Sequence, residues 1–307
     1  MAPANSGPQS GGPVPALCGC ILLQFEESFG LLYVIINAIP GAANGQKSMT
    51  TETASIRAIY RYPIKGLSPQ ALDRAPLSIG HSIAADRLYS IENGPCGFDP
   101  DAPAYFPKHR FLMLMRNERL ASLRTHFDEI SHTLIIESEG REAARADLRT
   151  KEGRLIIEAF FRRFMPKELR GPPKVLFGKN GHSFSDVARK VVSIINLASV
   201  AAVESAVGAP VNPLRFRGNL YVAGWPAWHE FGLVDQILSV GRHARLKIVK
   251  RIQRCAATDV DPDTGIRDLT IPRTLLENFD HTDCGVYAEV VEGGEIAVGD
   301  PIRYDAQ

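Results

Sequence analysis

In this chain of 307 residues, the residue whose type and setting most suggest chemistry is Cys255, in the segment RIQRCAATDVDPDTG (251–265). Apolar and polar residues alternate before the cysteine, which predicts a strand that runs into it. The string DPDTG predicts a tight turn a few residues later. Arg251 and Arg254 bring positive charge, which favours the thiolate, the form of cysteine that acts as nucleophile and metal ligand. On these local features alone, a small buried thiol at a strand end is the simpler interpretation.

Three further motifs place a basic side chain where it could meet an anion. Lys65 lies in YPIKG, at the predicted end of a strand, and Arg87 lies in ADR, after a predicted turn. In RFRGNLYV, Arg215 and Arg217 stand two residues apart, so on an extended chain their side chains would share one face. Arginine binds phosphate and other oxyanions through its planar fork. Taken singly, each of these residues is more simply a solvated surface side chain.

The elements expected to position these residues are mostly short strands. Residues 56–62 alternate between two faces, which predicts a half-buried strand, and GRLIIEAF (153–160) is interpreted as another. Leu197, Val200 and Val203 recur at helical spacing, and the helix is expected to stop at Gly208.

Many short strands and few helices, with 26 glycines and 21 prolines, favour an antiparallel barrel or sandwich. The expected fold class is mainly β with some helix (α+β). We expect residues 55–178 to form one β-rich domain and residues 179–307 a second.

Composition excludes several functions. The 35 basic and 34 acidic residues nearly cancel and form no basic stripe, so we expect no nucleic-acid partner. No GxGxxG or P-loop string is present to cradle a nucleotide. The five cysteines are odd in number and include no CxxC pair or zinc-type cluster, which favours reduced thiols in a cytoplasmic protein.

The first part of the chain differs from the rest. Residues 1–15 are small, polar and rich in proline, and residues 16–42 are apolar but interrupted by Glu26 and Glu27. The uninterrupted runs fall short of the ~20 residues that a membrane span needs, and the first basic residue, Lys47, comes too late for a secretory signal. We therefore expect residues 1–54 to be a disordered or non-native extension, with Met49 as a possible true start and a membrane anchor as the alternative.

Taken together, Lys65, Arg87, Arg217 and Cys255 occur in an order that resembles the MOSC family. This family is named for the C-terminal domain of molybdenum cofactor sulfurase, and it includes the mitochondrial amidoxime-reducing component and bacterial relatives. The strings that carry the resemblance span about residues 55–305, and they are YPIKG, ADR, INLASV, RFRGNLYV, RCAATDVDPDTG and GVYAEV followed by GGEIAVGD. The pattern RCxxTxVDPxTG is the specific one. The resemblance implies a MOSC-type β-barrel with an N-terminal β-rich domain.

The resemblance also implies a site. In this family a cysteine ligates the molybdenum of a molybdopterin cofactor, which puts the metal-ligand and catalytic role on Cys255. Contacts to the pterin or its phosphate are implied for five residues, of which the last two are weaker candidates: Lys65, Arg87, Arg217, Asn219 and Arg254. A soft thiolate suits molybdenum, and fixed cations suit phosphate and pterin oxygens.

Four positions depart from the pattern of the relatives and put some cofactor contacts in doubt. Gly66 stands where a serine is frequent, Ile252 and Gln253 stand where small or thiol side chains are frequent, and Asp259 stands where a threonine is frequent. None of these changes touches the implied ligand.

The function that the resemblance implies is molybdenum-dependent reduction of N-hydroxylated compounds. The electrons would come from a separate flavin or iron–sulfur reductase, because no cysteine set for an iron–sulfur cluster remains. No pyridoxal phosphate is expected, since the sulfurase domain that holds it needs far more chain. One alternative is a sulfur carrier or cofactor-binding module that uses a Cys255 persulfide. Another is a catalytically silent barrel that binds other proteins.

Overall fold

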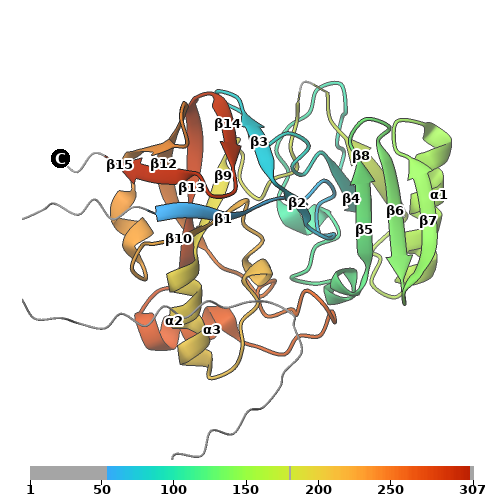
Figure 1. Ribbon diagram of the computed structural model, residues 1–307. Coiled ribbons are helices and arrows are strands. Elements are labelled where there is room, and N and C mark those ends of the chain that lie inside the picture. Colours follow the sequence, from blue (N-terminus) through green and yellow to red (C-terminus); the bar gives the residue numbers. More distant parts are fainter. Residues whose placement is uncertain (1–53, 180, 305–307) are drawn as a thin grey trace, which may run out of the picture. The chain divides into compact units, whose positions relative to one another are not determined.

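A computed structural model describes residues 54–179 and 181–304, and the expectations for residues 1–53 lie outside this part of the chain. Seven of the described strands close into a barrel, in the order β10–β9–β13–β12–β11–β15–β1, and pairing of β1 with β10 completes the circle (Figure 1). All of these pairs are antiparallel except that of β10 with β9. The seven strands are β1 (Ala54–Arg61), β9 (Val192–Asn196), β10 (Leu220–Ala223), β11 (Ile237–Val240), β12 (Ala244–Gln253), β13 (Asp283–Glu292) and β15 (Pro301–Tyr304).

The barrel follows from the alternation in the sequence. Alternate residues of its strands point inward and are fully buried, for example Ile56 on β1, Ile194 on β9 and Ile248 on β12. Burial of such β-branched side chains on the inner face fixes the register, because a slip of one residue would turn the whole apolar set outward. The mainly β fold with a barrel and some helix, expected from the sequence, is confirmed.

Smaller sheets flank the barrel. A short strand, β2 (Gln70–Leu72), extends the barrel sheet beside β1, and β3 (Arg74–Leu77) pairs with β14 (Gly294–Ala297). A two-stranded sheet joins β4 (Tyr89–Asn93) to β8 (Pro173–Phe177). A three-stranded sheet contains β5 (Arg124–Asp128), β6 (Thr133–Ser138) and β7 (Arg141–Asp147). Since β1 and β3 pair with strands from the C-terminal half, the domain boundary near residue 178 stays a prediction.

The segment 153–160, interpreted above as a strand, is instead part of helix α1 (Lys151–Phe164). The Thr150 side chain caps the helix by accepting a hydrogen bond of 2.9 Å from the Gly153 amide. Ile157, Phe160 and Phe161 then fall on one buried face, at a spacing that only a helix provides. The interpretation as a strand was wrong because the short apolar run fits both periods, and the cap decides between them.

The other α-helices are α2 (Leu197–Val207) and α3 (Ile271–Phe279). The expected helix stop at Gly208 is confirmed, because this residue adopts a left-handed conformation with φ of 73°. Val200 and Val203 of α2 lie in one buried cluster with Ile271 and Leu275 of α3. No described helix combines the length and the apolar character needed to cross a membrane.

A fully buried carboxyl group fixes the start of α2. Glu230 accepts hydrogen bonds of 2.8 Å from the side-chain amide of Asn196, the cap residue, and 2.8 Å from the hydroxyl of Ser199. Burial raises the pKa of Glu230, and these hydrogen bonds offset only part of that shift.

Replacing Glu230 by Gln is therefore expected to change how stability depends on pH. A raised pKa in the folded state means that the contribution of this carboxyl group is fully present below its unfolded pKa of about 4.3. The contribution is lost as pH rises through the folded pKa. Urea unfolding from about pH 4 to about pH 8 should thus show the wild type losing stability relative to Glu230→Gln. A difference between the two proteins that stays constant over this range would contradict the expectation.

Candidate functional site

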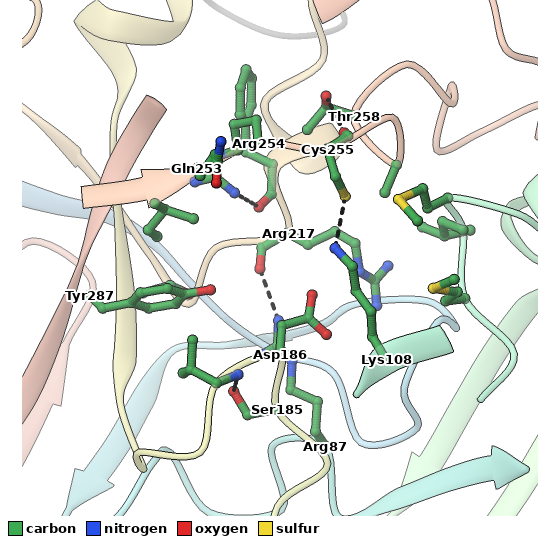
Figure 2. A pocket seen from close by; sticks show the side chains of 18 of the residues that line it. Arg87, Lys108, Ser185, Asp186, Arg217, Gln253, Arg254, Cys255, Thr258 and Tyr287 are labelled. Carbon is green, nitrogen blue, oxygen red and sulfur yellow. Dashed lines mark hydrogen bonds between the residues drawn. The ribbon is translucent and has the colours of Figure 1, made fainter. Parts of the chain in front are cut away.

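A cavity of about 460 Å³ lies beside the end of β12, and its lining comes from widely separated segments (Figure 2). This volume is within the range of cavities that hold small ligands. All six residues named from the sequence line it, namely Lys65, Arg87, Arg217, Asn219, Arg254 and Cys255. Their convergence makes this cavity the candidate site.

Cys255 lies in a turn that begins where β12 ends at Gln253. The amide and the hydroxyl of Thr258 both donate to the Cys255 carbonyl, each at 3.0 Å. Beyond this turn, Asp261 accepts hydrogen bonds from the amides of two residues of the DPDTG string, 3.0 Å from Asp263 and 2.7 Å from Thr264. The turn chemistry expected here is confirmed, and it holds the partly exposed Cys255 at the edge of the cavity.

Arg215 holds the same loop in place through hydrogen bonds and ion pairs. Its guanidinium donates to the Asp259 carbonyl at 3.1 Å and contacts the carboxylates of Asp261 and Asp268, at 3.1 and 2.7 Å. The expectation that Arg215 and Arg217 share one face is wrong, because the chain is not extended there. Residues Pro213–Phe216 form a 3₁₀-helix and Arg217 itself is left-handed, with φ of 49°.

The cation next to the Cys255 sulfur is Lys108, which the sequence did not single out. Its Nζ donates to Cys255 Sγ at 3.2 Å, as Figure 2 shows. The two arginines expected to charge the cysteine have other partners. Arg251 stacks on the ring of Phe231, 4.3 Å from its centroid, and Arg254 bonds to backbone carbonyls. No sequence signal pointed to Lys108, because it lies 147 residues from the cysteine, at the start of a short 3₁₀-helix (Lys108–Arg110).

Arg254 lines the cavity but its guanidinium serves the fold. Nε donates to the Cys284 carbonyl at 2.7 Å, and one terminal nitrogen donates to the Phe216 carbonyl at 2.8 Å. The other terminal nitrogen also reaches the Cys284 carbonyl. The side chain thereby ties β13 and the 3₁₀-helix before Arg217 to the segment that carries Cys255.

Arg254→Ala is therefore expected to lower the free energy of unfolding by about 2–4 kcal/mol, since it leaves two carbonyls without their charged partner. Arg251→Ala is the matched control, because it removes an exposed arginine whose stacking is worth only about 0.5–1 kcal/mol. Urea denaturation measures both values. Equal losses in the two variants would contradict a structural role for Arg254.

Tyr62, from the YPIKG motif, forms a platform for two of the cavity's arginines. The guanidinium carbons of Arg87 and Arg217 lie 4.8 and 4.2 Å from the centroid of its ring. Arg87 also contacts the Asp86 carboxylate and donates to the Arg217 carbonyl at 3.1 Å, while Arg217 donates to the Leu67 carbonyl at 2.9 Å. The Tyr62 ring thus holds the guanidinium groups of Arg87 and Arg217 near each other, so that both could bind one anion.

The charges of these arginines are held differently. Burial acts to lower the pKa of Arg87, but Asp86 outweighs it and the pKa is raised. Burial lowers the pKa of Arg217. Nothing offsets this shift as Asp86 does for Arg87, because no carboxylate of the described residues forms an ion pair with Arg217. Arg217 is therefore the cation in this pair that most lacks a counter-charge.

Lys65 is almost fully buried and forms an ion pair with Asp186 at the cavity wall. Its Nζ donates to the Phe184 carbonyl at 2.8 Å and to Asp186 Oδ1. Burial lowers the pKa of Lys65, and Asp186 opposes this shift. Burial would raise the pKa of Asp186, but Lys65 and then Lys108 hold it well below its usual range. The Asp186 side chain is 49 % exposed, so solvent weakens these interactions.

Asn219 is buried and its side chain is already satisfied within the fold. Its carbonyl oxygen accepts from the amide and hydroxyl of Ser193 at 3.0 and 2.8 Å, and its amide donates to the Tyr60 carbonyl at 3.1 Å. These bonds join β9, β1 and the start of β10. A contact between Asn219 and a cofactor stays a prediction.

The donor set indicates what the cavity could hold. The cavity is lined by eight basic residues and two carboxylates: Lys65, Arg87, Lys108, Arg215, Arg217, Lys250, Arg251 and Arg254, with Asp86 and Asp186. This balance favours an anionic ligand. Within the described residues, no group of three or more His, Cys, Asp or Glu side chains could hold a bare metal ion. One thiol beside several cations instead fits a metal that arrives already chelated by an anionic organic ligand.

Comparison with known proteins agrees with this picture. Residues 173–303 match the family model described as MOSC domain. The chain is 31 % identical over 123 residues to mitochondrial amidoxime reducing component 2 of Bos taurus, which covers 36 % of each chain. It is 28 % identical over 149 residues to mitochondrial amidoxime-reducing component 1 of Mus musculus, which covers 45 % of this chain and 42 % of that protein. The matched part thus spans less than half the length of these relatives.

A solved structure, that of the YUAD protein from Bacillus subtilis, covers 83 % of this chain and 97 % of its own. It has 12 % sequence identity and a TM-score of 0.40, which is too low to carry an argument about function. The family model and the barrel lead to the same conclusion. Residues 173–303 match the MOSC domain model, so the resemblance to this family that the sequence predicted is confirmed for this part of the chain.

Proposed function

We propose that this protein binds a molybdenum–molybdopterin cofactor in the cavity beside Cys255 and reduces N-hydroxylated compounds with electrons from a separate reductase. The observation that supports the proposal most is the meeting of one partly exposed thiol with Lys65, Arg87 and Arg217 around a single cavity, in a chain that matches the MOSC domain model. The names of the relatives supply the substrate class.

The roles of the residues follow from their positions. Cys255 would ligate the metal from its turn, and Arg87 and Arg217 would bind the phosphate or pterin oxygens from the Tyr62 platform. Lys65, which also lines the cavity, would add a third cation. When bound, such a cofactor supplies two-electron redox chemistry. The overall change would be an N-hydroxy group plus two electrons and two protons giving the amine-type nitrogen and water.

The test is to purify the protein from a host that makes the cofactor and to measure molybdenum and the fluorescent oxidised pterin. About one of each per chain is expected, together with reduction of benzamidoxime by a chemical electron donor. A protein without molybdenum or pterin contradicts the proposal. Sulfur released from Cys255 by cyanide in a molybdenum-free protein would instead support the sulfur-carrier alternative.

A further inference from the structure

A lysine from outside the matched domain contacts Cys255, the proposed metal ligand. Lys108 Nζ lies 3.2 Å from Cys255 Sγ, and both side chains line the cavity (Figure 2). Lys108 lies outside the segment that matches the MOSC domain model, residues 173–303. The neighbourhood of the proposed metal ligand is therefore completed by the N-terminal half of the chain.

The segment that carries Lys108 is held in place on both sides. Before Lys108, the Tyr105 hydroxyl donates to the Asp186 carbonyl at 3.2 Å, and the Phe106 ring packs 6.0 Å from that of Phe98. After it, the Phe111 amide donates to the Lys108 carbonyl at 3.1 Å, and Phe111 is bridged to β4. Anchoring of this kind places the base of the side chain, so the contact with the sulfur is built into the fold.

The side chain beside the sulfur is that of a lysine, which is normally an ammonium group at neutral pH. The neighbouring arginines cannot substitute, because Arg251 stacks on Phe231 and Arg254 is bonded to backbone carbonyls. Among the described residues, Lys108 is the basic side chain hydrogen-bonded to this sulfur.

We propose that Lys108 is a positioning residue for Cys255: its ammonium group holds the sulfur at the cavity and, by donating to it, raises the reduction potential of the metal that the sulfur would ligate. A donor to a metal-bound thiolate withdraws electron density from the sulfur and so stabilises the reduced state of the metal. The part of this inference that concerns the potential rests on the proposed molybdenum ligation by Cys255.

The first arm of the test uses metal-free protein and does not depend on that ligation. Cys255 is alkylated with iodoacetate or iodoacetamide, and mass spectrometry of its peptide gives the two rates. Both reagents attack the thiolate, so the ratio of their rates reports the charge beside the sulfur and not its degree of ionisation. The rate with iodoacetate, which is an anion, divided by the rate with neutral iodoacetamide is expected to fall about fivefold or more in Lys108→Met. Lys250→Met is the matched control, because Lys250 lines the same cavity but lies over Tyr287, and a smaller change is expected there.

The second arm uses the molybdenum-loaded protein. Lys108→Met should retain molybdenum to within about twofold of the wild type, while a redox titration of its paramagnetic molybdenum signal gives a lower midpoint potential. Lys108→Arg, which keeps the charge, should recover part of the shift. An unchanged alkylation ratio, or an unchanged midpoint potential in loaded Lys108→Met, would overturn the inference. If the wild type takes up no molybdenum, the proposed function fails, whereas the alkylation result still decides whether Lys108 acts on the sulfur.

Discussion

Cys255→Ser is expected to purify without molybdenum, at less than about a tenth of the wild-type content, and to reduce benzamidoxime no faster than the reagents do alone. Cys255 supplies the thiol at the cavity, and a serine hydroxyl is a poor substitute for a thiolate at molybdenum. The Cys255 side chain makes only one hydrogen bond in the described structure, to Lys108. The free energy of unfolding should therefore change by less than about 1 kcal/mol.

Cys96→Ser is the matched control for this experiment. Cys96 is likewise a free, partly exposed cysteine, but it does not line the cavity. Molybdenum measured by mass spectrometry and the pterin fluorophore should stay at wild-type levels in this variant. Equal molybdenum in Cys255→Ser and wild type would show that another residue holds the metal. Equal loss in both serine variants would point to a general effect of thiol removal.

Arg217→Met is expected to lower the cofactor content by about tenfold or more while leaving stability nearly unchanged. Charge-assisted hydrogen bonds to an anion are each worth about 1.5–3 kcal/mol, which accounts for the loss of binding. Stability should be spared because Arg217 has no carboxylate partner among the described residues and its pKa is lowered by burial. Removing a desolvated charge without a counter-ion relieves a cost that offsets the lost bond to Leu67.

Two measurements decide this prediction, molybdenum per chain and urea unfolding. Arg57→Met serves as the control, because Arg57 is an exposed arginine on β1 and does not line the cavity. It should match the wild type in both measurements. Retained molybdenum in Arg217→Met would remove this residue from the cofactor site. A stability loss as large as that expected for Arg254→Ala would show that Arg217 is also a structural residue.

These two arginines show why the sequence could predict residues that meet at one cavity but could not assign every role. Arg217 and Arg254 both line the cavity, as the motifs led us to expect, with Arg254 as the weaker candidate for a cofactor contact. Only the fold reveals that Arg254 donates its hydrogen bonds to the carbonyls of Cys284 and Phe216, whereas Arg217 has no carboxylate partner among the described residues. A motif specifies a residue type, but the partners of a long side chain depend on segments far away in the chain.

The sequence by itself determined features that arise between near neighbours. Alternating apolar residues defined the barrel strands, Gly208 ended α2, and DPDTG formed the turn after Cys255. These features follow from local hydrogen bonding and side-chain periodicity, so they can be predicted from short strings. Short apolar runs are the exception, as α1 shows, because both periods fit them until the cap at Thr150 is seen.

Only the tertiary structure decided which side chains meet across the chain. It placed Lys108 against a sulfur 147 residues later, and it paired Lys65 with Asp186 across 121 residues. Neither contact has a local signature, because each depends on how two segments that are far apart in the chain pack against each other. The sequence could thus single out Cys255, but it could not predict that Lys108 lies beside its sulfur. The packing of distant segments brings this lysine to Cys255, whereas the arginines next to Cys255 in the sequence have other partners.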